Sequence, residues 1–153
     1  MRRFISISLA VLFAFSIPSS KGQNKPATRQ EESYMLGRVL SAVEDVGAGE
    51  YRIIDQKYIK EGLRKLSEIN KDIEKRQYSI RLRWLAHHWY GRALLDSGDA
   101  KRALPFLETA ENEANSPSVS CPTFDSCIND KEKAKNSELL RQTREKLAAT
   151  QGS

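Results

Sequence analysis

The chain has 153 residues, 29% of them charged, with 25 basic side chains against 20 acidic ones. A length of this order suits one domain with a modest core. Removing the first 22 residues takes away three basic residues and no acidic one, which leaves a net charge near +2. That balance argues against a nucleic-acid partner, because a nucleic-acid-binding domain normally keeps a strong basic excess.

Residues 1–22 have the order of a secretory signal peptide. Two arginines precede an uncharged apolar run over residues 4–17, and a turn with small residues follows. The run is shorter than the roughly 20 residues that a membrane-spanning helix needs. Cleavage after Gly22 would leave small residues at the two positions that signal peptidase recognises, Gly22 at −1 and Ser20 at −3. We therefore expect an exported protein, periplasmic or extracellular, without stable membrane insertion once the signal is removed. An uncleaved membrane anchor is the alternative.

Helical periodicity dominates the chain that remains. Residues 23–30 are polar and predict a flexible leader, and residues 150–153 form a short tail. Apolar residues recur at helical spacing from residue 31 to the glycines at 47 and 49, and over about 51–75, 79–96, 99–114 and 129–149. Since no stretch alternates like a strand, residues 31–149 are predicted to form a single all-α domain of about five helices.

The same spacing predicts the core-facing side chains. They are Leu36, Val39, Leu40 and Val43 in the first helix, Ile59, Leu63, Leu66 and Ile69 or Ile73 in the second, and Ala134, Leu140 and Leu147 in the last.

The third and fourth helices show the strongest pattern. Ser97-Gly98-Asp99 joins them, because Gly98 can take the left-handed conformation that ends a helix and the Asp99 carboxylate can cap the next. Small and apolar residues at helical spacing predict close contact between the two helices. They are Tyr90, Gly91 and Leu94 on one and Ala103, Leu107, Ala110 and Ala114 on the other.

On these residues the stretch from about 84 to 117 resembles one tetratricopeptide repeat. It departs from the family in two places, at His87 and at Asn115. Pro105 lies early in the second helix of the repeat and predicts a kink rather than a break. The resemblance implies a degenerate first hairpin and a C-terminal helix that caps the array with a polar outer face. A five-helix bundle without repeat geometry is the alternative. The resemblance also implies a non-enzymatic module that binds a protein or peptide.

In that family, the corresponding face of the first helix of each repeat lines the groove that holds peptides. Here this face carries Leu85, His88, Arg92 and Leu95, with His88 exposed and His87 packed. An arginine between leucines suits a peptide with an acidic group flanked by apolar side chains. Coverage of this face by a neighbouring helix is the alternative.

A local basic cluster is the second candidate surface. It consists of Lys71, Lys75, Arg76, Arg81 and Arg83. Such a cluster is either a solvated connection between helices or a contact surface for anionic groups.

Cys121 and Cys127 bracket a short loop. In an exported chain a pair of cysteines predicts a disulfide, and the spacing is not the C-x-x-C of redox proteins. A redox pair or a metal site is the alternative. The adjacent His87 and His88 diverge on a helix and cannot chelate one metal together. A zinc site that combines them with both cysteines is the remaining alternative.

Motifs of catalysis are lacking in the sequence. It contains no phosphate loop, no nucleophile elbow and no H-E-x-x-H. We expect no enzymatic activity, no cofactor and no metal. The alternatives are a small exported enzyme with a site between helices and a secreted inhibitor of a partner enzyme.

Overall fold

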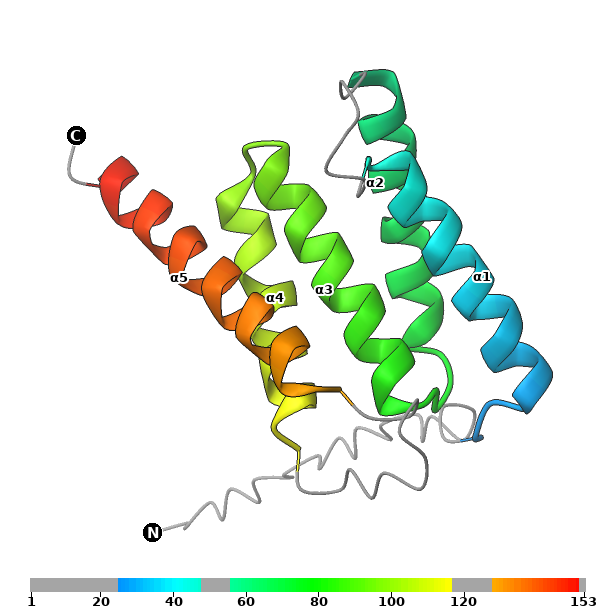
Figure 1. Cartoon of the computed structure of the whole chain (residues 1–153). Coiled ribbons are helices and arrows are strands. Elements are labelled where there is room, and N and C mark those ends of the chain that lie inside the picture. Colours follow the sequence, from blue (N-terminus) through cyan, green and yellow to red (C-terminus); the bar gives the residue numbers. More distant parts are fainter. Residues whose placement is uncertain (1–24, 48–55, 117–127, 152–153) are drawn as a thin grey trace, which may run out of the picture.

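The computed structural model describes residues 25–47, 56–116 and 128–151. In these ranges the chain forms five α-helices and no β-strand, which confirms the all-α prediction (Figure 1). The helices are α1 (Arg29–Asp45), α2 (Gln56–Ile73), α3 (Ile80–Asp96), α4 (Ala100–Ala114) and α5 (Asp130–Gln151).

The helices form two layers around α3. In Figure 1, α1, α3 and α5 lie in the nearer layer, and α2 and α4 lie behind them. Helix α3 contacts all four other helices, while α1 and α2 pack on each other and α5 packs on α3 and α4. Helix α3 is therefore the centre of the domain, and the pairs α1–α2 and α4–α5 lie on its two sides.

Local capping explains where the helices begin. Thr28 and Glu31 form a reciprocal capping box at α1, and the Ser79 hydroxyl accepts the Leu82 N–H at α3. The predicted turn between α3 and α4 is confirmed. Gly98 has a φ of 90°, and the Asp99 carboxylate accepts the Arg102 N–H at 3.1 Å. Helix α4 then continues through Pro105 to Ala114.

Most of the predicted core is confirmed. The faces through which α3 and α4 were predicted to contact each other are buried. Helix α2 buries Ile59, Leu66, Ile69 and Ile73, and Leu63 is partly covered. Glycines mark two of the helix crossings. A Cβ on Gly62 would lie 2.5 Å from Val46 Cγ2 of the chain after α1, and one on Gly91 would lie 2.6 Å from Leu107 Cγ of α4. These crossings therefore need the absence of a side chain.

The predicted core faces of α1 and α5 need correction. Val39 and Val43 of α1 are buried as predicted, but Leu36 and Leu40 are 38% and 51% exposed, and Met35 and Ala42 are buried instead. Because adjacent helical residues lie about 100° apart, this face is turned away from Leu36 and Leu40, toward α2 and α3. In α5, Ala134 is exposed. The helix packs with Leu140 and with two buried polar residues, Asn136 and Thr143.

Candidate partner-binding site

The outward face of α3 presents an aromatic ring between an apolar and a cationic side chain. Leu85, Trp89 and Arg92 are each partly exposed and lie on one side of the helix, one turn apart. The Arg92 guanidinium lies 5.0 Å from the centre of the Trp89 ring, a cation–π contact. Its Nε lies 3.6 Å from an Asp96 carboxylate oxygen, a loose ion pair. This face can contact an apolar group and an anion at the same time.

Two residues of the predicted groove are covered. His88 is 4% exposed and Leu95 is 2% exposed, so the prediction of an exposed His88 is wrong. Residues three apart on a helix are offset by about 60°, which turns these two side chains away from Leu85 and Arg92. His88 Nδ1 lies 2.9 Å from the Asn136 side chain, so α5 covers this flank of α3. The structure thus keeps Leu85 and Arg92 accessible and removes His88 and Leu95 from the surface.

Around His88, the polar contacts form a buried network between three helices. The Asn136 amide nitrogen donates to the Leu107 carbonyl oxygen at 3.0 Å and to the Glu111 carboxylate at 2.9 Å. The indole of Trp84 stacks on the imidazole with ring centres 4.7 Å apart. Burial lowers the pKa of His88, and the charges of Arg92 and Lys135 act in the same direction. The imidazole is therefore held neutral in a structural position.

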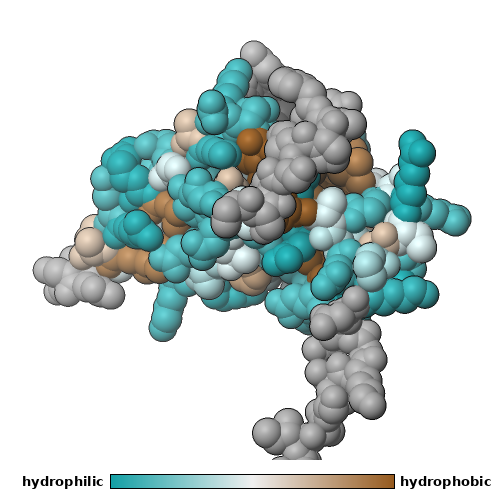
Figure 2. Space-filling view, turned by 90° about the horizontal axis from the view of Figure 1, so that it is seen from below, coloured by the Kyte–Doolittle hydropathy of each residue, from teal (hydrophilic) through white to brown (hydrophobic). Residues whose placement is uncertain are grey.

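The basic cluster is largely balanced by carboxylates. It lies along the end of α2, the α2–α3 connection and the start of α3. Its ion pairs are Lys75–Asp72, Arg76–Glu31, Arg81–Glu132 and Arg83–Glu113, while Lys71 is exposed. Seen from below in Figure 2, hydrophobic residues form separate patches among hydrophilic ones. The cluster is thus not a continuous field of free cations.

A cavity of about 580 Å³ lies beside this cluster, between the α2–α3 connection, α3 and α4. It is lined by Ile73, Glu74, Arg76, Gln77, Arg83, His87, Pro105, Phe106 and Thr109. His87 is buried, as predicted, and its Nδ1 lies 2.8 Å from the buried Glu113 carboxylate. Arg83 lies 2.9 Å from the other oxygen of Glu113, in an ion pair without hydrogen-bond geometry. The cavity therefore combines an oriented imidazole with an apolar wall.

Three important residues were not among the predicted site residues. Trp89 follows Leu85 by four positions and precedes Arg92 by three, a spacing that could have identified it. Asn136 and Glu113 gave no such signal, because polar residues on a helix are usually solvated. Their burial depends on which helix packs against them.

Cys121 and Cys127 lie outside the described residues, as does the predicted signal peptide. Within the described ranges, no group of His, Cys, Asp and Glu side chains is arranged to hold a metal ion. None of the helices in those ranges has both the length and the apolar character needed to cross a membrane.

Comparison with known proteins gives no relative from which a function could be transferred. No protein-family model matches the chain, and no curated protein or solved structure matches it significantly. The function must therefore be inferred from the residues themselves.

Proposed function

We propose that this chain is an exported, non-enzymatic module that binds a protein or peptide partner through the outward face of α3. The observation that carries the proposal is the arrangement of Leu85, Trp89 and Arg92 on that face, with the arginine stacked over the indole ring. The signal-like residues 1–22 support export, and the resemblance to a tetratricopeptide hairpin supports peptide binding.

The chemistry of the face indicates the kind of peptide. Arginine binds carboxylates through two parallel hydrogen bonds, and the indole offers a large surface for an apolar side chain. The ligand class is therefore an extended segment with an Asp or Glu next to leucine or phenylalanine.

Binding of short synthetic peptides to the purified mature protein tests this proposal. Peptides with one Glu flanked by leucine and phenylalanine should bind, and the same peptides with Lys in place of Glu should not. Arg92→Ala should weaken binding about tenfold or more, because a charged hydrogen-bonded contact contributes about 1.5–3 kcal/mol. Trp89→Ala should weaken binding of both the acidic peptide and any partner captured from the native compartment.

Matched controls separate this site from a general effect of lost charge or aromatic area. Arg141→Ala removes an exposed arginine that pairs within its own helix, as Arg92 does, and Tyr58→Ala removes an exposed aromatic side chain from α2. Both should bind like the parent. Equal binding by the parent, Arg92→Ala and Trp89→Ala would reject the α3 face as the site.

A second candidate function rests on His87. Its Nδ1 contact with Glu113 would favour one tautomer, the arrangement used to orient a histidine base, and the ring lines the 580 Å³ cavity. Thr109 lines the same cavity, but its hydroxyl donates to the Pro105 carbonyl oxygen at 2.8 Å. A hydrolase at this site would therefore use a water molecule as its nucleophile, with His87 as the base, and not the Thr109 hydroxyl. Hydrolase activity in the purified parent that is lost in His87→Gln would favour this function over the binding module.

A further inference from the structure

Helix α1 carries most of the large exposed hydrophobic side chains in the described part of the chain. Tyr34, Leu36 and Leu40 are exposed on it, and the fourth such residue is Tyr58 of α2. Because α1 packs on α2 and α3 with its opposite side, these residues lie on a face that no described segment covers. Leu36 and Leu40 lie one turn apart and form a contiguous exposed apolar pair, and exposed apolar patches mark contact sites when they are contiguous.

A row of small residues runs between these side chains. At about 100° per residue, Ser33, Gly37 and Ser41 share one line along α1, with Leu36 and Leu40 on one side and Tyr34 on the other. The row opens onto a groove of about 460 Å³ between α1 and α2, to which α2 contributes Lys65, Glu68 and Ile69. The face therefore has both projecting side chains and a valley that can receive them.

Gly37 differs from the other two described helical glycines. A Cβ on Gly62 or Gly91 would collide with a neighbouring segment of the chain, so both mark a close crossing. A Cβ on Gly37 would meet nothing within 4 Å. A glycine inside a helix costs stability relative to alanine, and the fold itself gives Gly37 no compensating contact. Its position matches that of a crossing whose second helix comes from outside the chain.

The two outer sides of the domain differ in whether a further helix covers them. Helix α5 packs on the α3–α4 pair and covers its outer side, whereas the main contacts of the α1–α2 pair with the other described helices are those with α3. The domain thus already uses one helix pair to hold a further helix, and the second pair has its outer groove open.

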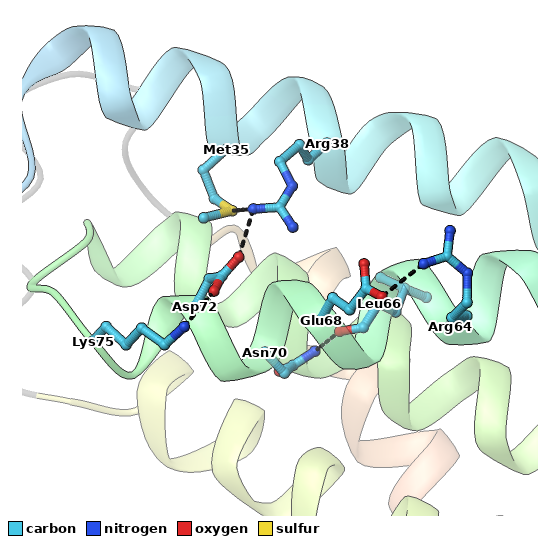
Figure 3. A network of polar contacts seen from close by, with 8 residues as sticks. All are labelled: Met35, Arg38, Arg64, Leu66, Glu68, Asn70, Asp72 and Lys75. Carbon is cyan, nitrogen blue, oxygen red and sulfur yellow. Dashed lines mark hydrogen bonds and ion pairs between the residues drawn. The ribbon is translucent and has the colours of Figure 1, made fainter.

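Charge indicates what kind of partner fits. The charged groups at this groove are paired within the chain. Figure 3 shows Arg38 with Asp72 and Arg64 with Glu68. Lys65 pairs with Asp45, and Arg64 also pairs with Glu61. A strongly acidic or basic partner would gain little from such a balanced surface. A second copy presents the same balanced charges and the same combination of valley and projecting leucines, as a two-fold interface requires.

We propose that two copies of this chain associate through their α1–α2 faces around a two-fold axis, with the α1 helices crossing at Gly37. Leu36 and Leu40 of one copy then occupy the small-residue valley of the other, and Tyr34 packs at its edge. The interface uses none of the residues Leu85, Trp89 and Arg92 of the α3 face, so substitutions can test the two proposals one at a time.

Sedimentation equilibrium of the mature protein across the micromolar range tests the proposal. The parent should show twice the monomer mass. Gly37→Leu should be monomeric with an unchanged circular dichroism spectrum, because its side chain blocks the crossing and meets nothing in the isolated chain. Ala134→Leu places the same side chain at an exposed position of α5 and should remain dimeric. Leu40→Lys, which changes a projecting residue without touching the valley, should also be monomeric.

Two outcomes would overturn the proposal. A parent that stays monomeric up to the highest concentration would exclude a second copy as the occupant and leave the groove to a helix of another protein. Dimers that persist in both Gly37→Leu and Leu40→Lys would place the interface elsewhere on the molecule.

Discussion

The side-chain amide oxygen of Asn136 lies 2.9 Å from Nδ1 of His88 and fixes which imidazole nitrogen carries a proton. The Asn136 nitrogen already donates to Leu107 and Glu111, so the amide can present only its oxygen to His88. His88 therefore donates from Nδ1. One buried amide thus joins α3, α4 and α5 with every one of these contacts satisfied, which explains why a polar residue occupies a core position of α5.

Truncation of this amide should be among the most destabilising changes in α5. Asn136→Ala leaves the His88 N–H without an acceptor in a buried site, whereas the Leu107 carbonyl oxygen keeps its helical bond within α4. The expected cost is about 1–3 kcal/mol in the free energy of unfolding. Denaturant unfolding followed by circular dichroism measures this. Lys146→Ala, at an exposed position of the same helix, should change the value by less than about 0.5 kcal/mol. Similar values for the two variants would contradict a structural role for Asn136.

Stability should fall in mild acid because of His88. Its pKa in the folded chain lies below the ordinary 6.5, chiefly through burial, so the unfolded chain binds more protons between the two values. The free energy of unfolding should therefore decrease as the pH falls through 6.5 toward the lowered pKa. Denaturant titrations at several pH values should show a weaker dependence over this window in His88→Gln. An identical pH dependence in parent and variant would show that His88 does not contribute to the loss of stability in acid.

Replacing a glycine with alanine should have opposite effects on the free energy of unfolding at two positions. Gly91→Ala places a Cβ 2.6 Å from Leu107 Cγ, which forces α3 and α4 apart and should cost about 1–3 kcal/mol. Gly37→Ala meets nothing and removes backbone freedom from the unfolded chain, so it should raise the stability of the monomer by up to about 1 kcal/mol. Thermal unfolding at a concentration low enough to keep the chain monomeric compares them. Equal effects of the two changes would contradict the difference in packing.

Export and cysteine pairing are tested by mass. The small residues before Gln23 predict that position as the mature N-terminus, and Cys121 and Cys127 should be joined in the exported protein. Intact-mass measurement with thiol labelling under denaturing, non-reducing conditions checks both. Full-length chain in the membrane fraction would contradict removal of the signal. Two labelled thiols would favour the redox or metal alternative.

Local chemistry in the sequence determined where the helices lie and how the α3–α4 turn is made. Gly98 and Asp99 act on their immediate neighbours, so their roles could be predicted without knowing the fold. The small residues at Gly91 and Ala103 likewise predicted a close crossing, since few side chains fit between two helices in contact.

Only the tertiary structure decided which sides of α1, α3 and α5 are covered. Periodicity gives the angle between residues on a helix, but the direction of the covered side depends on where the neighbouring helices pack. That is why Leu36 and Leu40 are exposed while Met35 is buried, and why His88 is covered although Leu85 and Arg92 remain accessible. Asn136 shows the same limit, because a polar side chain enters a core only where partners from other helices satisfy its hydrogen bonds.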